Sequence, residues 1–458
     1  MSGSLARRVF GVSTDSRRVR EGDLFVALRG ERFDGHDFVP QALERGAAGC
    51  LVASAKPFDV KWSGPAVLEV RDTLAGLWAL ARWHRAGLDI PFVGVTGTCG
   101  KTSTKELIAA ALGEGETLGG EAFMSPASFN NRIGVPISLL MIRRRHAIAV
   151  LELGSNAPGE IEELAQLARP KIAVITGVGV GHLAGLHDPQ GVLIEKLSIV
   201  KGLGPGGTLV VNGDDPVLVA EVRARGYRFV SFGLGPMSRF RGEDVDLTPH
   251  GTRFRYKGRQ VFIRLFGAHT VLNALAALAV AELLGQTRAR AIAGLSEVRP
   301  VSGRLSPVHA GRMTILDDTY NSNPFSMRAA LAVFHRWPVG ARRVVILGDM
   351  RELGAQSERW HRRMGELCGL IQPDLVVTCG AEARFILEGA GDQGFSSRKM
   401  LHFKSTESLL AQISDIVSHD DLVLVKGSRA LKMERVVDRL IKSAMAVPHA
   451  VSPALSVA

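Results

Sequence analysis

Short apolar runs alternate with helical patterns through the middle of this 458-residue chain. Four of the runs are continuously apolar, as expected for strands buried on both faces of a parallel sheet: FVGVTG, AIAVLELG, KIAVITGVGV and TLVVNGDD. The segment VDLTPHGTRFRYKGRQVFIRLFG (245–267) predicts an antiparallel hairpin attached to that sheet. The helical pattern ALAALAVAELLG should end at Gly285.

Similar patterns flank this part of the chain on both sides. On the N-terminal side, GDLFVALRG predicts a strand and FVPQALERGAAGCLV a helix followed by a strand, while TLAGLWALARWHRAGL has the apolar spacing of a helix. Beyond VRPVSGRLSPV (298–308), four more strands with helices between them predict a Rossmann-like unit: MTILDDTY, RRVVILGDM, DLVVTCG and DLVLVKGS.

The chain is therefore predicted to be an α/β protein of three domains. Residues 1–88 are expected to form a small α/β domain, residues 89–300 a central parallel-sheet domain, and residues 301–445 a C-terminal Rossmann-like domain. The tail at 446–458 lacks periodicity and is expected to be disordered. Three domains agree with the chain length at roughly 100–200 residues per domain.

Composition and charge narrow the class of protein. Apolar residues make up 46% of the chain, but no run of about 18 of them occurs, so no membrane span is expected. The N-terminus lacks the apolar core of a signal peptide, and the four cysteines stand apart without a zinc-binding spacing, which indicates a cytoplasmic protein with reduced thiols. The net charge of +11 fits nucleic-acid binding or an enzyme with anionic small substrates. The lack of a long Lys/Arg run or an RNA-binding aromatic motif favours the enzyme.

The segment VGVTGTCGKTSTKELIAAAL predicts a phosphate-binding loop. It departs from the usual P-loop spelling because Val95 stands five positions before the Gly–Lys pair, where glycine is expected. A helix that follows a parallel strand offers unpaired N–H groups and a favourable dipole to phosphate, and Gly97 and Gly100 let the backbone come close. Lys101 can reach the β- and γ-phosphates and the Thr102 hydroxyl can bind Mg²⁺. The alternative is a glycine-rich turn with an incidental lysine.

Two polar residues follow neighbouring apolar strands. Glu152 ends the strand of AIAVLELG, and His182 comes after KIAVITGVGV. Ligands gather at the carboxyl ends of strands in such sheets, so a carboxylate and an imidazole there could hold Mg²⁺ beside the phosphates. Taken singly, His182 fits a structural role better, and Lys196 in GVLIEKLSIVKGL has by itself the pattern of a surface lysine.

Together, these residues and the three-domain order resemble the Mur ligases of peptidoglycan synthesis, over about 8–440. GVTGTCGKTSTKE is similar to that family's ATP loop, which tolerates the missing first glycine, although Cys99 is unusual there. STDSRRVREGDLFVALRGERFDGHDF resembles the family's uridine-nucleotide domain. FNNRIGVPISLL, DDTYNSNPFSM, LGDMRELG and VKGSRALKMERVV resemble the branch that joins D-alanyl-D-alanine to a UDP-MurNAc-tripeptide. The DNPR-type motif of the branch that adds diaminopimelate or lysine does not occur.

The resemblance implies roles for the matching residues. It implies ATP binding by Gly97, Thr98, Cys99, Gly100, Lys101, Thr102, Ser103, Asn273 and Asp318. It implies catalytic roles for Lys101, Lys196 and Arg304, with the arginine close to the γ-phosphate, and magnesium ligation by Thr102, Glu152, His182 and Lys196. Many family members carry the lysine that corresponds to Lys196 as a carbamate, which would turn a cation into a metal-binding anion. Contacts to the UDP substrate are implied for Ser16, Arg17, Asn130 and Asn131.

The closing face of the C-terminal domain, with the dipeptide site, is implied to contain Tyr320, Asn321, Asn323, Lys426, Ser428 and Arg429. The first three equally fit a capped turn between a strand and a helix, since Asn and Pro favour turns for local reasons. Asp349 and Glu352 likewise each fit two roles, contact with the substrate or a place in a salt-bridged loop.

The implied reaction consumes ATP with Mg²⁺, and the implied partners are UDP-MurNAc-tripeptide and D-alanyl-D-alanine. No nucleic acid is expected, and the protein is expected to be a monomer. Three alternative functions stay open. They are a ligase that adds an amino acid to UDP-MurNAc-dipeptide or glutamate to a folate, a P-loop protein that uses ATP or GTP only as a switch, and a nucleic-acid-binding protein.

Overall fold

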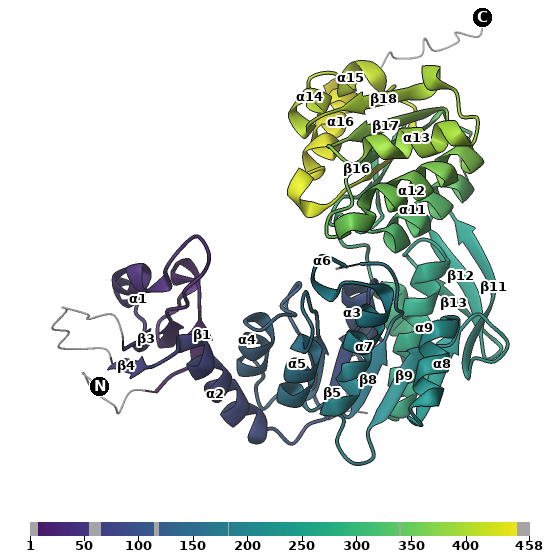
Figure 1. The fold of residues 1–458 in the computed structure, drawn as a ribbon. Coiled ribbons are helices and arrows are strands. Elements are labelled where there is room, and N and C mark those ends of the chain that lie inside the picture. Colours follow the sequence, from purple (N-terminus) through teal and green to yellow (C-terminus); the bar gives the residue numbers. More distant parts are fainter. Residues whose placement is uncertain (1–7, 55–65, 114–118, 182, 339, 447–458) are drawn as a thin grey trace, which may run out of the picture.

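The computed structural model describes residues 8–54, 66–113, 119–181, 183–338 and 340–446. Its strands form three sheets of four, nine and six strands, in that order along the chain. Figure 1 shows the six-stranded sheet and its helices stacked on the central part, while the first sheet lies to one side. The predicted α/β class and three-part architecture are confirmed, and the boundaries at 88/89 and 300/301 stay predictions. No helix in the described ranges is long and apolar enough to cross a membrane.

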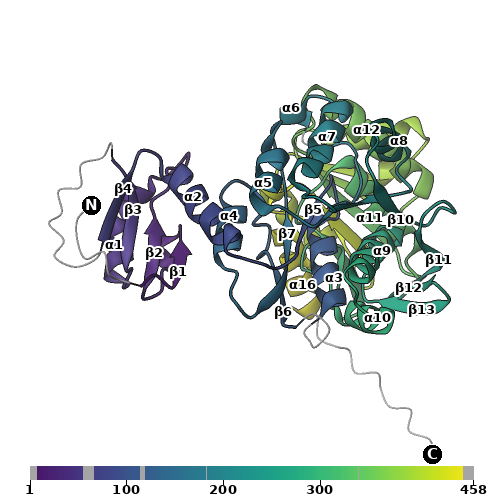
Figure 2. The ribbon, with the colours of Figure 1, turned by 90° about the horizontal axis from the view of Figure 1, so that it is seen from below.

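The N-terminal domain contains a parallel sheet in the order β1-β2-β3-β4. Its strands and helix are β1 (Gly11–Ser13), β2 (Asp23–Val26), β3 (Gly49–Ala53), β4 (Ala66–Val70) and α1 (Val39–Glu44). Helix α2 (Thr73–Ala86) begins at the Asp72 cap and leads to the central sheet. Figures 1 and 2 show α2 next to α4 (Gly134–Leu140), where the Trp78 indole N–H donates to the Arg132 carbonyl at 2.8 Å.

The central sheet has the order β13-β12-β11-β10-β9-β8-β5-β7-β6, with parallel pairing from β11 to β6. Its parallel strands are β5 (Phe92–Thr96), β6 (Glu121–Met124), β7 (His146–Glu152), β8 (Ile172–Ile175), β9 (Thr208–Asn212) and β10 (Phe229–Gly233). The predicted hairpin is in fact a three-stranded antiparallel extension of β11 (Phe240–Thr248), β12 (Gly251–Tyr256) and β13 (Arg259–Ile263). The extra strand arises because the chain turns twice, the second time at Lys257 and Gly258, which both have positive φ.

Helices cover both faces of the central sheet, which explains its continuously apolar strands. On one face pack α3 (Lys101–Leu112), α9 (Ala268–Leu283) and α10 (Arg288–Glu297). On the other face pack α4, α5 (Glu160–Ala168), α7 (Pro189–Leu197) and α8 (Pro216–Ala224). The short helix α6 (Leu183–Leu186) lies at the carboxyl end of the strands.

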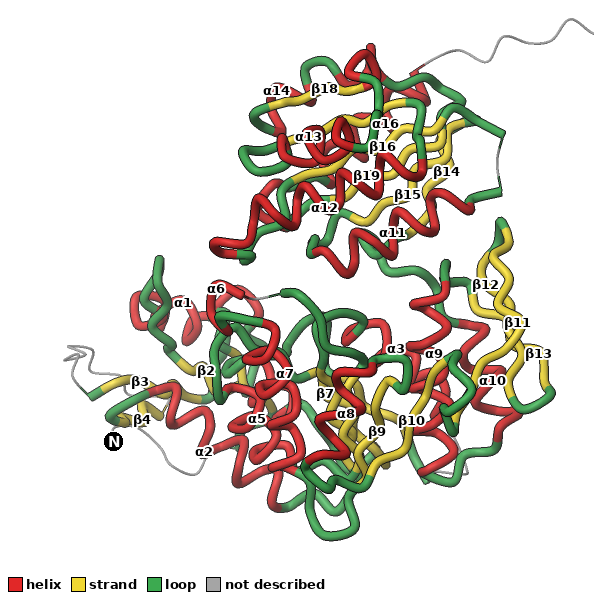
Figure 3. The backbone as a smooth tube through the Cα atoms, turned by 45° about the vertical axis from the view of Figure 1, so that its right-hand side comes forward, coloured by secondary structure: helices red, strands yellow, loops and turns green. Residues whose placement is uncertain are grey.

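The C-terminal sheet has the order β14-β15-β19-β16-β17-β18, in which only the edge pair β14–β15 is antiparallel. Its strands are β14 (Ser306–Ala310), β15 (Met313–Asp318), β16 (Arg343–Gly348), β17 (Leu375–Cys379), β18 (Met400–Phe403) and β19 (Leu422–Lys426). One face carries α11 (Pro324–Arg336), α12 (Ser357–Ile371) and α13 (Arg384–Asp392), and the other carries α14 (Thr406–Leu410), α15 (Ile413–Ile416) and α16 (Glu434–Ala446). Figure 3 shows α11 and α12 on the side of this domain that faces the central domain. Of the predicted tail, only Ala446 is described, as the last residue of α16, and 447–458 lie outside the described residues.

Helix α3, which follows the phosphate-binding loop, is held against α10 by a close backbone approach. A Cβ atom added at Gly294 would lie 2.0 Å from the Ala110 carbonyl oxygen, so only glycine fits between the two helices. The position of α3 therefore depends on the absence of a side chain on α10.

We expect Gly294→Ala to lower the midpoint of thermal unfolding, because overpacking of this kind costs roughly 1–3 kcal/mol. Gly204→Ala is the matched control, since nothing lies within 4 Å of a Cβ atom at that position. The control should unfold at the wild-type temperature or slightly above it. Equal unfolding temperatures for Gly294→Ala and wild type, measured by differential scanning fluorimetry, would contradict the packing argument.

Candidate active site

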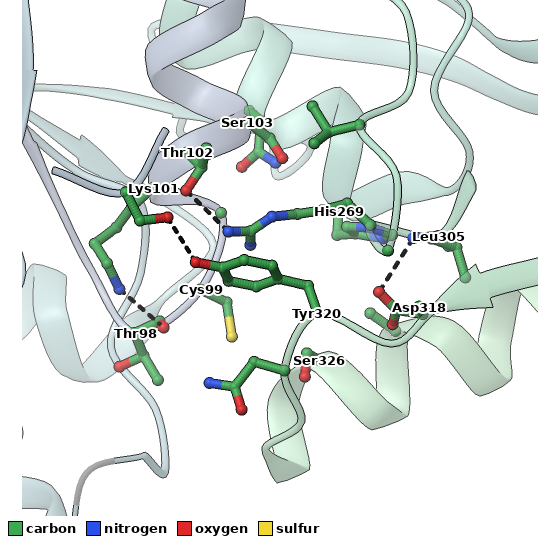
Figure 4. A pocket seen from close by; sticks show the side chains of 18 of the residues that line it. Thr98, Cys99, Lys101, Thr102, Ser103, His269, Leu305, Asp318, Tyr320 and Ser326 are labelled. Carbon is green, nitrogen blue, oxygen red and sulfur yellow. Dashed lines mark hydrogen bonds between the residues drawn. The ribbon is translucent and has the colours of Figure 1, made fainter. Parts of the chain in front are cut away.

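A cavity of about 340 Å³ lies between the central and C-terminal domains. Its walls come from the phosphate-binding loop, the end of β7, the start of α9, the joint at 298–305 and the edge of the C-terminal sheet, and Figure 4 shows part of this lining. Most of the predicted ATP, metal and closing-face residues line it: Thr98, Cys99, Gly100, Lys101, Thr102, Ser103, Asn130, Asn131, Glu152, Asn273, Arg304, Asp318, Tyr320, Asn321, Asn323 and Lys426. Residues from separate parts of the sequence thus surround one space.

The phosphate-binding loop runs from β5 into α3, as predicted. Its two glycines have φ of +142° and +81°, conformations that favour glycine. A Cβ atom at Gly100 would lie 2.6 Å from the Asn273 side-chain oxygen, so the loop and the start of α9 are in close contact. The Lys101 ammonium donates to the Gly97 carbonyl at 2.8 Å. Burial lowers the pKa of Lys101, and the nearby Glu152 carboxylate opposes that shift.

Glu152, the last residue of β7, is 1% exposed and has a hydrogen bond to each carboxylate oxygen. The Thr102 hydroxyl donates to Oε2 at 2.8 Å, and the Asn130 amide donates to Oε1 at 2.7 Å. The Thr102 oxygen in turn accepts from Nη2 of Arg304 at 3.0 Å. A hydroxyl and a carboxylate are thus held side by side at the start of α3, next to a cationic side chain from the interdomain joint.

This donor set fits Mg²⁺, which prefers oxygen ligands and usually takes only one or two of them from the protein beside substrate phosphates. Thr102 and Glu152 would hold the ion. In the part of the chain that the structure describes, no group of three or more His, Cys, Asp and Glu residues could form an all-protein metal cage. The predicted ligand His182 lies outside the described residues.

Lys196 is buried in α7, whereas its sequence pattern alone predicts a surface lysine. Its ammonium donates to the Ser155 hydroxyl at 2.7 Å, and Ser155 lines the cavity. Burial, and after it the positive charge of Lys101, lower the pKa of Lys196 to about 7. A substantial fraction of this amine is therefore uncharged at neutral pH.

Tyr320 and Asn323 contact the opposite wall of the cavity, and Arg304 packs on the Tyr320 ring. The Arg304 guanidinium lies 4.1 Å from the centre of the Tyr320 ring, a cation–π contact. The Tyr320 hydroxyl is 2.7 Å from the Ser128 hydroxyl, and the Cys99 sulfur is 3.1 Å from the Asn323 amide nitrogen. Figure 4 shows the Tyr320 ring in the middle of this group, pointing toward the phosphate-binding loop.

The strand ends of the C-terminal sheet contribute an ion pair. Asp318 and Lys426 are register partners on β15 and β19, and their side chains are 2.6 Å apart. Lys426 also donates to the Asn321 carbonyl at 2.9 Å. The Asn323 side chain accepts from the Ser326 N–H at 2.8 Å and caps α11, so the capped turn that the sequence left open is present at Asn323.

Some predicted residues lie elsewhere. The Ser16 hydroxyl donates to Gln41 at 2.6 Å, and Arg17 pairs with Asp15, both in the N-terminal domain. Asn130 and Asn131, predicted for the same substrate, line the cavity instead. These contacts to the UDP substrate stay predictions.

Two further predicted residues support the loop after β16. Ser428 accepts from the Arg351 N–H at 2.8 Å, while the fully buried Asp349 pairs with Arg351 and accepts from the N–H groups of residues 382 and 383. Asp349 therefore has the salt-bridged role among its two predicted alternatives.

The lining residues that the sequence prediction missed include Ser128 and His269. Ser128 contacts Tyr320 across the domains, and His269 lies at the start of α9 near Asp318 and Lys426. Serine is too common a residue for the sequence alone to single out Ser128. His269 had a signal, because it lies four residues before the predicted ATP contact Asn273, one helical turn away.

Comparison with known proteins gives one family for three segments of the chain. Residues 8–73 match the model described as "Mur ligase family, catalytic domain", residues 95–281 match "Mur ligase middle domain", and residues 303–429 match "Mur ligase, glutamate ligase domain". A protein of Bacillus subtilis (strain 168) named UDP-N-acetylmuramoyl-tripeptide–D-alanyl-D-alanine ligase is 36% identical over 438 residues, which are 95% of this chain and 94% of that protein. The Escherichia coli (strain K12) protein of the same name is 36% identical over 94% of this chain and 93% of its own.

Solved structures agree in fold. A crystal structure of MurF from Acinetobacter baumannii has a TM-score of 0.84 at 30% identity and covers 94% of this chain and 93% of that one. MurF ligase from Thermotoga maritima in complex with ADP has a TM-score of 0.82 at 30% identity, with 96% and 98% coverage.

His269 should make the stability of the protein sensitive to acid. Burial lowers its pKa from 6.5 to about 4, which the Asp318 carboxylate opposes and the Lys426 ammonium assists. Because the folded state holds this imidazole neutral, its contribution is present above pH 6.5 and is lost as the pH falls from 6.5 toward 4. We expect the free energy of unfolding of wild type to fall by about 1–2 kcal/mol relative to His269→Gln between pH 7.5 and 5. Urea denaturation at both pH values measures this difference, with the exposed His419→Gln as control, and parallel pH profiles for wild type and His269→Gln would contradict it.

Proposed function

Because this chain belongs to the Mur ligase family, we propose that it is a UDP-N-acetylmuramoyl-tripeptide–D-alanyl-D-alanine ligase, an ATP-dependent, ADP-forming enzyme of peptidoglycan synthesis. The observation that carries the proposal is the convergence on one cavity of a phosphate-binding loop, the Thr102–Glu152 pair and Arg304 from the following domain. A second domain on the opposite wall of this cavity favours a ligase over a nucleic-acid-binding protein, and the substrate requirement tested below separates a ligase from a nucleotide switch.

In the first step, the free carboxylate of UDP-MurNAc-tripeptide attacks the γ-phosphorus of ATP. A bond forms between the carboxylate oxygen and phosphorus, the bond to the β–γ bridging oxygen breaks, and ADP leaves with that electron pair. Two anions must approach each other, so neutralising charge is the main task of the site. Lys101 and Arg304 are the cationic side chains that line the phosphate end of the cavity.

In the second step, the amine of D-alanyl-D-alanine attacks the carbonyl carbon of the acyl phosphate. The tetrahedral intermediate loses phosphate with the C–O electron pair, and the amine loses a proton, which leaves a peptide bond. Water competes with the amine for the acyl phosphate, so the reacting groups must be shielded from solvent. The contacts of Arg304, Tyr320 and Asn323 with the central domain are suited to provide it.

Mg²⁺ would be held by Thr102 and Glu152, and when bound it supplies positive charge to the phosphate oxygens. A carbamate on Lys196 would add anionic oxygens to the same region. Its formation requires an uncharged amine, and the lowered pKa of Lys196 supports that requirement. The ATP-contacting roles of Asn273 and Asp318, the UDP contacts of Ser16 and Arg17 and the dipeptide contacts of Tyr320 and Asn321 belong to the same proposal. A cytoplasmic monomer remains our expectation.

The proposed function is tested by phosphate release with ATP and Mg²⁺. UDP-MurNAc-tripeptide and D-alanyl-D-alanine are added separately and then together, with the third residue of the tripeptide as lysine or diaminopimelate. Release that requires both substrates, with the pentapeptide product identified by mass spectrometry, is the expected result. Release without either substrate would indicate a nucleotide switch. Product from a free amino acid, but not from the dipeptide, would indicate another ligase of the family.

Lys101→Ala should abolish turnover, with a loss of at least about 10³-fold in kcat, because it removes a fixed positive charge from the site of phosphoryl transfer. Lys171→Ala, on an exposed lysine that precedes β8, is the matched control and should retain full activity. Both variants should give wild-type circular dichroism and gel-filtration profiles. Substantial ligase activity in folded Lys101→Ala would remove this lysine from the mechanism.

A further inference from the structure

A second lysine of α3, Lys105, is almost completely buried although it carries a charge. It lies one helical turn beyond Lys101, and only 1% of its surface is exposed. Its ammonium donates to the carbonyl oxygens of Ser125 and Ala127, both at 2.7 Å. Burial lowers its pKa, and the carboxylates of Glu152 and Glu106 oppose that shift while Arg304 assists it. Burying an ammonium group costs several kcal/mol unless hydrogen bonds offset the loss of solvation. The burial of Lys105, together with the two hydrogen bonds that offset it, therefore calls for an explanation.

The two carbonyl groups belong to residues 125–132, which we call the bridging loop. Ala127 has a φ of +41°, in the left-handed region that disfavours residues with a side chain. The Ser125 side chain is anchored as well, because its hydroxyl oxygen accepts from the Glu152 N–H at 3.2 Å. The strained backbone conformation of Ala127 persists only where its surroundings impose it. Lys105 supplies two of the hydrogen bonds that do so.

The bridging loop contacts all three domains within five residues. Ser128 meets the Tyr320 hydroxyl of the C-terminal domain at 2.7 Å. Asn130 donates to the Glu152 carboxylate of the central site at 2.7 Å. The Arg132 carbonyl accepts from Trp78 on α2, the helix that leads from the N-terminal sheet. A displacement of this loop would therefore move the metal-binding carboxylate and the opposite wall of the cavity relative to each other.

We propose that Lys105 is a positioning residue of the ligase reaction, whose ammonium holds the bridging loop in the arrangement that orients Glu152 and engages Tyr320. The inference rests on the proposed function. Lys105 does not line the cavity and touches neither nucleotide nor substrate in this scheme; it acts through Ser125 and Ala127. Its role differs from that of Lys101, which faces the phosphates, although the two lysines stand on the same helix.

The main test is Lys105→Met, which keeps an unbranched apolar stem and removes the ammonium. We expect kcat with all three substrates to fall about 100-fold, since displacements of about 1 Å at a reacting centre have that effect. Affinity for ADP alone, measured by calorimetry, should stay near the wild-type value, because the phosphate-binding loop is intact. Lys171→Met makes the same substitution on an exposed lysine and should match wild type in both measurements.

A double-mutant cycle separates positioning from general stabilisation. Tyr320→Phe removes the hydroxyl that meets Ser128 and should lower kcat about 5- to 10-fold in wild type, as expected for one hydrogen bond. In the Lys105→Met background, the same change should cost little more, because the loop no longer holds Ser128 in place. Hydrogen exchange of the folded Lys105→Met protein should show faster exchange confined to residues 125–132 and their contacts.

Three results would overturn the proposal. The first is a Lys105→Met protein that unfolds at a lower temperature but has wild-type kcat and KM. The second is a full, additive loss from Tyr320→Phe in the Lys105→Met background. If Lys105→Met does not fold, Lys105→Gln takes its place, because its uncharged side chain is one bond shorter and should not hold both carbonyls. Wild-type kinetics in that variant is the third result. Absence of ligase activity in wild type would instead refute the proposed function, and the hydrogen-exchange measurement would still test the hold of Lys105 on the loop.

Discussion

The hydrogen bond between Thr102 and Glu152 is the interaction on which the rest of the site depends. It ties the first turn of α3 to the last residue of β7, and it therefore couples the position of the glycine-bearing loop before α3 to that of the Glu152 carboxylate. The parallel sheet makes this possible, because β5 and β7 are adjacent and end at the same edge. The hydrogen bonds from Asn130 to Glu152 and from Arg304 to Thr102 then attach the bridging loop and the C-terminal domain to that pair.

The arrangement of charges follows from the same geometry. Lys101, Lys105 and Lys196 all carry ammonium groups that burial makes less favourable, and each is compensated in a different way. Lys101 donates to the Gly97 and Thr98 carbonyls and faces the cavity, Lys105 is satisfied by the Ser125 and Ala127 carbonyls, and Lys196 has one hydroxyl partner at 2.7 Å. Burial and the nearby charge of Lys101 lower the pKa of Lys196 to about 7.

Much of this architecture follows from the sequence, because its determinants are local. The apolar runs give the strands, the glycine-rich turn gives the phosphate loop, and the end of an apolar strand gives Glu152. Lys105 and Ser128 could not be found in that way. Lys105 has the spacing of an ordinary helical lysine, and its burial depends on a loop that folds over it from about twenty residues later. The same limit explains Lys196, which pattern alone places on the surface. The extra strand of the antiparallel extension is a different case, because the turn at Lys257 and Gly258 is local and the prediction overlooked it.

The cavity has one wall in each of two domains, and this affects how the protein unfolds. A nucleotide or substrate that touches both walls binds only while both domains are folded and docked, so its binding free energy is shared between them. In its absence, the two domains are joined by the backbone at 298–305, by side-chain hydrogen bonds and by apolar contacts such as that of Phe266 with Trp337, whose ring centres are 4.8 Å apart. A bound ligand would therefore do more than raise a melting temperature. It would couple the unfolding of the two domains more tightly, and it would protect the joint at 298–305 from proteolysis.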